Sequence, residues 1–188
     1  MAFKSFKNSP EVDNRGSVRD PDEVQIMFPD DATGLRKVVA PLRIALGIII
    51  LVTWVENLTK GTYSGGGISG LFEYIFDENG GGSAFYRAII GGTILQAPAA
   101  FGAFQLVAEF LMGVGLLLGL FTPLVGLGAG LFFVNLTLAF WGGQEWIWTY
   151  VLLTVSSVVA ALTRSGRAWG IDAWLLSRRG EPSLKFLR

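Results

Sequence analysis

The chain of 188 residues contains neither cysteine nor histidine. Haem iron is ordinarily held by His, Met, Cys or Tyr, iron–sulfur clusters by Cys, and zinc by Cys and His. The absence of both residue types excludes an ordinary haem-b site, an iron–sulfur cluster, histidine-ligated chlorophyll and a disulfide within the chain. We therefore expect no metal site. A redox role requires that another subunit or a bound substrate supplies the redox group.

Charge is also scarce, at 16% of the residues, whereas soluble domains carry about 25%. Hydrophobic residues make up 51% of the chain, and its mean hydropathy is +0.49. Apolar stretches occupy residues 38–58, 101–121 and 124–141, with a slightly short fourth at 146–162. A helix of about 20 apolar residues crosses the roughly 30 Å hydrocarbon layer. The sequence predicts an all-α integral membrane protein, a bundle of four transmembrane helices in one domain.

The basic residues are distributed unevenly along the chain. Only Lys60 and Arg87 lie between the first and the last predicted span, and the other thirteen of the 15 precede the first span, lie within its start or follow the fourth. Four spans put both termini on one side, and the positive-inside rule makes that side cytoplasmic. We expect an N-in/C-in protein of a prokaryotic inner membrane.

Three regions flank or interrupt the predicted bundle of residues 36–163. A polar arm, 1–35, is expected to be disordered unless another protein chain, or the chain's own helix ends, gives it a surface. The external loop, 61–100, has glycine-rich runs that we expect to be flexible, and two apolar pieces suited to short interfacial or re-entrant helices. Such a cap is consistent with either a cover for a cavity between the spans or a binding surface for a partner protein. The cytoplasmic tail, 164–188, combines Trp and Leu with Arg and Lys, which suits a helix lying on an anionic leaflet.

An ionisable residue, Glu109, stands within the second apolar stretch. Its placement in a bilayer costs roughly 2.5–3.5 kcal/mol. At 1.5 Å per residue it lies ~12 Å below the outer interface, and Gln105 lies one turn away on the same face. Polar residues of the other spans reach the same outer half of the bilayer. We predict an outward-open polar pocket around Glu109, formed with Gln105, Asn135, Glu56, Lys60 and Tyr150.

Two interpretations of this constellation stay open. In the first, Glu109 is a proton donor or acceptor, or a ligand for a polar head group. In the second, it makes a structural hydrogen bond between helices, worth about 0.6–2 kcal/mol. Glu56 and Lys60 have the favourable i,i+4 spacing for an ion pair and are equally consistent with a solvated helix end. On the inner side, Arg43 and Asp172 are predicted to form a structural ion pair that ties the two ends of the bundle together.

Short motifs carry a resemblance. The first predicted helix has an Arg–Leu–Gly start and a closing lysine, the second has Glu, Gly, Leu and Gly in order, and a Gly–x–x–x–Gly–x–Asp exit follows the fourth. These residues are Arg43, Leu46, Gly47, Lys60, Glu109, Gly113, Leu116, Gly119, Gly166, Gly170 and Asp172. With the long outer loop, they make residues 38–176 similar to the DoxX-like family, and within it to the DoxD type, the small membrane subunit of thiosulfate:quinone oxidoreductases.

The resemblance implies a membrane subunit that takes part in electron transfer from thiosulfate to quinone, giving tetrathionate. The pocket would then admit the quinone head, and Glu109 would take its protons. The alternative is a non-catalytic accessory or scaffold subunit of a larger respiratory or photosynthetic complex, because a fold does not fix a function. Under both hypotheses the expected partners are membrane lipids and other protein subunits, and no nucleic acid.

Overall fold

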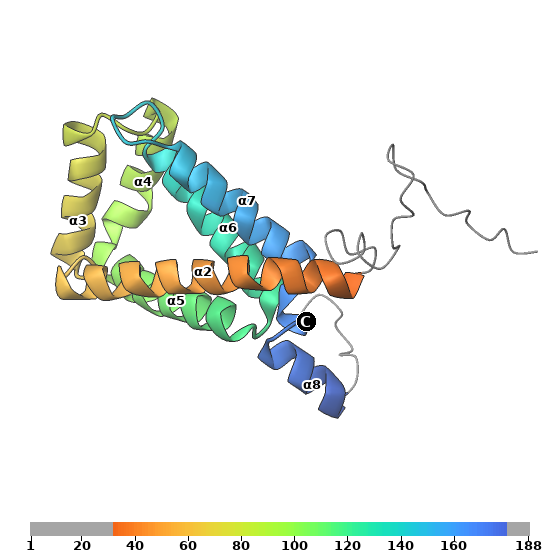
Figure 1. Cartoon of the computed structure of the whole chain (residues 1–188). Coiled ribbons are helices and arrows are strands. Elements are labelled where there is room, and N and C mark those ends of the chain that lie inside the picture. Colours follow the sequence, from red (N-terminus) through yellow and green to blue (C-terminus); the bar gives the residue numbers. More distant parts are fainter. Residues whose placement is uncertain (1–31, 180–188) are drawn as a thin grey trace, which may run out of the picture.

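The computed structural model describes residues 32–179, and this part of the chain is helical, without strands (Figure 1). The arm before residue 32 and the tail after residue 179 lie outside the described residues. In chain order the elements are α2 (Ala32–Thr59), α3 (Gly65–Glu73), the π-helix η1 (Tyr74–Glu78), α4 (Ala84–Gly92), the 3-10 helix η2 (Ile94–Gln96), α5 (Pro98–Leu118), α6 (Thr122–Ala139), α7 (Trp148–Leu162), the 3-10 helix η3 (Ser165–Arg167) and α8 (Ile171–Arg179).

Three of the described helices, α2, α5 and α6, are long and apolar enough to cross a membrane. The prediction of a helical membrane protein is thus confirmed at this level. The fourth predicted span corresponds to α7, an apolar helix of 15 residues. Its chain continues through η3 into α8, which falls within the predicted tail.

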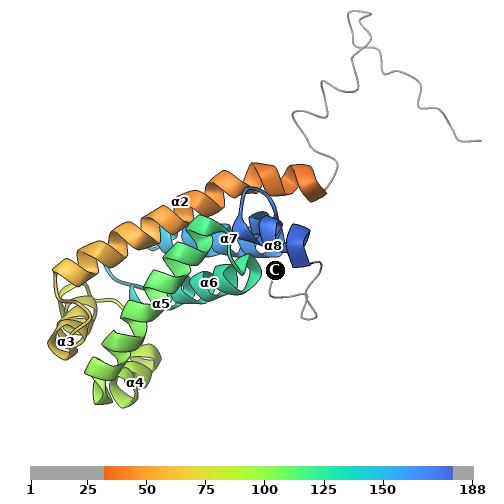
Figure 2. The same ribbon diagram turned by 90° about the horizontal axis from the view of Figure 1, so that it is seen from below.

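The long helices form two pairs, α2 with α5 and α6 with α7. The pairs lie close together at the end that holds the α5–α6 turn and α8, and they spread apart toward the other end, where α3 and α4 stand (Figures 1 and 2). We call these the hairpin end and the cap end. Each end therefore brings together polar side chains that are far apart in the sequence.

The α5–α6 turn follows directly from local sequence. Gly119 ends α5 with φ 65°, the left-handed conformation that favours glycine. Thr122 and Pro123 begin α6, and proline suits the first turn of a helix because that turn's N–H groups have no helical acceptor. The second span consequently ends at Leu118, before the predicted residue 121.

The loop predicted at 61–100 folds into a compact cap of short helices. Ser64 and Ser83 begin α3 and α4 by accepting hydrogen bonds from the main-chain N–H groups of Gly67 (2.9 Å) and Tyr86 (3.2 Å). Part of the first glycine run is helical, because Gly65–Gly67 form the first turn of α3. The cap has its own apolar core, which also includes the end of α6 and comprises Ile68, Phe72, Ile75, Tyr86, Ile90, Ala139 and Phe140.

Close approach of α2 and α5 depends on Gly47. A Cβ atom there would lie 2.5 Å from the main-chain nitrogen of Leu117 and 2.9 Å from the carbonyl oxygen of Gly113. Neither backbone atom can move as a flexible side chain can. Small residues of this kind are what lets two membrane helices pack backbone to backbone.

We expect Gly47→Ala to lower the thermal unfolding midpoint of the purified chain, with a destabilisation of about 1–3 kcal/mol from overpacking. Gly91→Ala is the matched control, because Gly91 lies inside α4 with open space around the added methyl group. An unchanged midpoint for Gly47→Ala would mean that α2 and α5 do not pack backbone to backbone at Gly47.

Candidate functional site

Glu109 of α5 is 1% exposed, and both of its carboxylate oxygens are hydrogen-bonded within the chain. The Tyr63 hydroxyl donates to Oε2 at 2.5 Å, and the Gln105 side-chain amide donates to Oε1 at 2.7 Å. Among the described residues, no lysine or arginine forms an ion pair with this carboxylate. Its partners are therefore neutral groups, one from the same helix and one from the cap end of the chain.

Tyr63 lies in the turn between α2 and α3 and is itself buried. This turn rests directly on α5, since a Cβ atom on Gly102 would collide with the main-chain carbonyl of Tyr63. Burial, then the hydrogen bond to Glu109 and the charge of Glu109, raise the pKa of the Tyr63 hydroxyl above its usual range, partly offset by a hydrogen bond with Asn57. Tyr63 therefore keeps its proton at neutral pH.

The chemistry of these three side chains suits a carboxyl that gains and loses a proton. A tyrosine hydroxyl can donate to a carboxylate or accept from a carboxylic acid, whereas the glutamine amide can donate to either form. A change of protonation at Glu109 therefore needs no movement of the heavy atoms of Tyr63 or Gln105.

The structure distributes the other predicted pocket residues over different places. Asn135 accepts a hydrogen bond from the Tyr86 hydroxyl at 3.0 Å, which ties α4 to α6. Burial raises the pKa of Tyr86 to about 12, partly offset by that bond. Glu56 and Lys60 pair with each other at 3.4 Å on the exposed end of α2, and Tyr150 stacks on Phe140 with ring centroids 5.3 Å apart. Of the predicted set, only Gln105 bonds to Glu109.

Glu109 does not line either of two open depressions on the described surface. One, of about 460 Å³, lies between the end of α5 and the start of α8. The other, of about 350 Å³, lies on α2 and is lined by Ile48, Leu51, Val52, Val55 and Glu56.

The sequence patterns did not predict the roles of Tyr63 and Tyr86, because both lie in the loop, where no hydrophobic periodicity assigns a position to a side chain.

At the hairpin end, Arg43 and Asp172 are both fully buried near one another, but they are not joined by a direct ion pair. The Arg43 guanidinium donates to the carbonyl oxygens of Leu116 (2.8 Å), Leu117 (3.4 Å) and Trp169 (3.4 Å). The predicted direct contact between the two charges is therefore not formed, because Arg43 directs its hydrogen bonds to main-chain carbonyls.

Asp172 binds the other side of the same turn. Its two carboxylate oxygens accept hydrogen bonds from the main-chain N–H groups of Phe121 and Thr122, each at 2.9 Å. Arg43 therefore binds the C-terminal carbonyls of α5, and Asp172 binds the N-terminal amides of α6. Each charge lies at the helix end whose dipole stabilises it. We call these two side chains and the turn between them the hairpin clamp.

Glycines make room for the hairpin clamp. A Cβ atom on Gly119 would collide with Nη1 of Arg43, and one on Gly166 would collide with Oγ1 of Thr122. Gly170 lies against the carbonyl oxygen of Gly166 and against Gly119 in the same way. Several residues that carry the resemblance to the DoxX-like family thus pack together in a single structural unit.

Comparison with known proteins adds no assignment, since no protein-family model and no solved structure matches this chain.

We expect Asp172→Asn to destabilise the protein by about 1–3 kcal/mol, because the asparagine amide has one acceptor oxygen for two main-chain donors and loses the charge. The unfolding midpoint in detergent measures this effect. Asp77→Asn removes a largely exposed carboxylate from the cap and should leave the midpoint nearly unchanged. Equal midpoints for wild type and Asp172→Asn would rule out the capping role of Asp172.

Tyr63→Phe leaves Oε2 of Glu109 without its donor, so it should loosen the attachment of the cap to α5. We expect faster amide hydrogen exchange in residues 61–73, and a loss of about 1–3 kcal/mol in stability. Tyr74→Phe, at an exposed tyrosine of the same cap, is the control. Identical exchange in the two variants would show that the Tyr63–Glu109 bond does not hold the cap.

Proposed function

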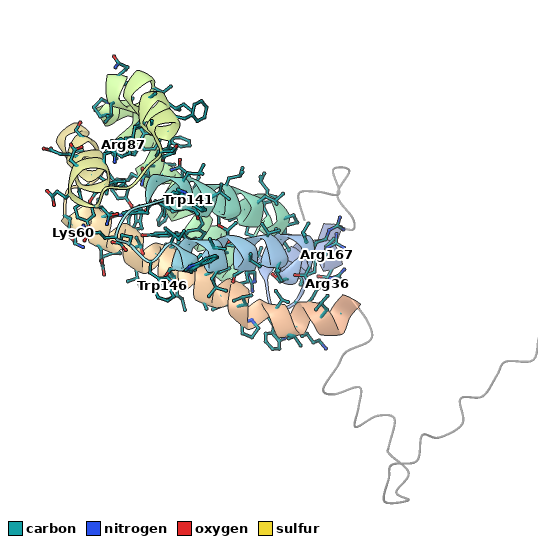
Figure 3. All side chains as sticks on the ribbon, turned by 90° about the horizontal axis from the view of Figure 1, so that it is seen from above. Arg36, Lys60, Arg87, Trp141, Trp146 and Arg167 are labelled. Carbon is teal, nitrogen blue, oxygen red and sulfur yellow. The ribbon has the colours of Figure 1, made fainter. Side chains whose placement is uncertain are left out.

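We propose that the chain crosses the prokaryotic inner membrane four times, with the hairpin end on the cytoplasmic side. Arg36 and Arg167 lie at the hairpin end, whereas Lys60 and Arg87 lie at the cap end (Figure 3). Thirteen of the 15 basic residues precede the first span, lie within its start or follow the fourth, so the positive-inside rule favours the hairpin end as cytoplasmic.

Further support comes from α7 and the tryptophans. At 1.5 Å per residue, α7 is roughly 22 Å long, and it packs along α6, so it lies at the same depth. Exposed tryptophans occur at both ends. Trp141 and Trp146 lie near the cap (Figure 3), and Trp169 and Trp174 lie beside the end of α5. Tryptophan is enriched at both interfaces of a membrane.

Within this topology, the function that the site supports best is that of a membrane subunit of a quinone-reducing oxidoreductase of the thiosulfate:quinone type. The observation that carries the proposal is the Glu109–Tyr63–Gln105 network, whose hydrogen bonds accommodate a carboxyl in either protonation state. Two thiosulfate ions release two electrons as they join in tetrathionate, and a quinone takes up these electrons with two protons to become a quinol. The network would exchange protons with the quinone, and a partner subunit would transfer the electrons.

The proposed place for a membrane-dissolved quinone is the apolar depression on α2, which is lined by residues of α2 and not by Glu109. Trp54, from the same stretch of α2, donates from Nε1 to the carbonyl oxygen of Leu106 (2.9 Å) and packs on Phe110 with ring centroids 5.2 Å apart. Leu106 and Phe110 flank Glu109 along α5. Ile48, Leu51, Val52 and Val55 would hold the apolar part of the quinone.

The test is thiosulfate-dependent reduction of a soluble quinone analogue by the purified complex that contains this chain. Glu109→Gln keeps the shape of the side chain and its hydrogen bond with Tyr63 but cannot exchange a proton. We expect the turnover number to fall by about 10²-fold, the usual contribution of a positioned proton donor or acceptor. Glu73→Gln, an exposed carboxylate of the cap, should retain full activity.

One observation favours the accessory-subunit alternative, namely that both oxygens of Glu109 are already bonded inside the chain and the side chain is buried. A scaffold subunit would use this network only to hold the cap. In that case the complex that contains the chain would show no thiosulfate-dependent quinone reduction, and Glu109→Gln would change its stability alone.

A further inference from the structure

The depression at the hairpin end has the lining of a lipid-binding groove. It lies between the end of α5 and the start of α8, holds about 460 Å³, and is lined mainly by apolar atoms. Leu117, Leu118 and Ile171 form its apolar wall, and Trp169 and Trp174 belong to its lining. Leu118, at the end of a membrane-crossing helix, is itself exposed, so the groove continues onto the surface that faces lipid.

Trp169 has an unusual backbone. Its φ of 55° lies in the left-handed region, which a bulky residue other than glycine rarely adopts. The conformation is held in place by the hairpin clamp, since Nη2 of Arg43 donates to the carbonyl oxygen of Trp169 at 3.4 Å. Despite its size, the side chain is 67% exposed. A constrained backbone thus presents a large indole at the edge of the groove.

Positive charge lies at this end of the bundle. The guanidinium of Arg178 lies 5.1 Å from the ring centre of Trp174, and Arg36 and Arg167 lie at the same hairpin end (Figure 3). Among the described residues, the acidic side chain at this end is Asp172, which is buried with its oxygens bonded to Phe121 and Thr122. No exposed carboxylate of the described chain therefore competes for an anion here.

We propose that this groove binds an anionic phospholipid. The acyl chain lies against Leu117 and Leu118, the indoles of Trp169 and Trp174 lie at headgroup level, and the phosphate binds the Arg178 guanidinium, whose planar donors suit phosphate. Charge complementarity and continuity with the lipid-facing surface favour a lipid over a peptide segment. The site is separate from Glu109, so it does not depend on quinone chemistry.

Native mass spectrometry of the intact chain tests this site, by titration with phosphatidylglycerol and with phosphatidylcholine of the same acyl length. We expect tighter binding of the anionic lipid, and a loss of about fivefold in its affinity for Arg178→Gln, the contribution of one basic residue near an anionic surface. Lys60→Gln removes the same charge from the cap end and should bind phosphatidylglycerol as the wild type does. Trp174→Leu should weaken both lipids.

Equal affinity for the two lipids would overturn the proposal. So would equal losses in Arg178→Gln and Lys60→Gln, because these would show that only the total charge of the chain matters. Arg178 is exposed, so the variant is expected to fold, and its unfolding midpoint without added lipid checks this directly.

Discussion

The α5–α6 turn, held by charges at both helix ends, is the constraint on which the rest of the fold depends. Arg43 comes from α2 and Asp172 from α8, so the clamp joins four helices at one point. Each buried charge is stabilised by main-chain dipoles, and the two also attract each other. From this fixed end, the two helix pairs spread toward the cap. The sequence predicted that these residues meet but not the main-chain groups between them.

The cap end is held differently, by an apolar core and by two tyrosine hydroxyls. Tyr63 bonds to Glu109 of α5 and Tyr86 to Asn135 of α6, so each helix pair is bonded to the cap through a tyrosine hydroxyl. A substitution at Glu109 therefore alters the hydrogen bond that attaches the cap and also removes the buried carboxyl group. This dual position links the structural and the proton-exchanging interpretation, because both use the same hydrogen bond.

Sequence patterns predicted those features that depend on spacing along one helix. Hydropathy located the long helices, and the i,i+4 relation placed Gln105 beside Glu109. The partner Tyr63 could not be predicted, because it lies in a turn whose position depends on tertiary packing. The helix at Gly65–Gly67 was also missed, since glycine disfavours helices. There the Ser64 cap, together with burial of the following apolar residues, outweighs local propensity.

The central claim is that Glu109 changes protonation when quinone is reduced. Infrared difference spectroscopy of the purified complex, recorded between the oxidised and reduced states of added quinone, tests it most directly. The account predicts a carboxyl C=O band that shifts on labelling glutamate with ¹³C and disappears in Glu109→Gln. A difference spectrum without a carboxyl band, or with one that survives this substitution, would contradict the account and favour a purely structural role.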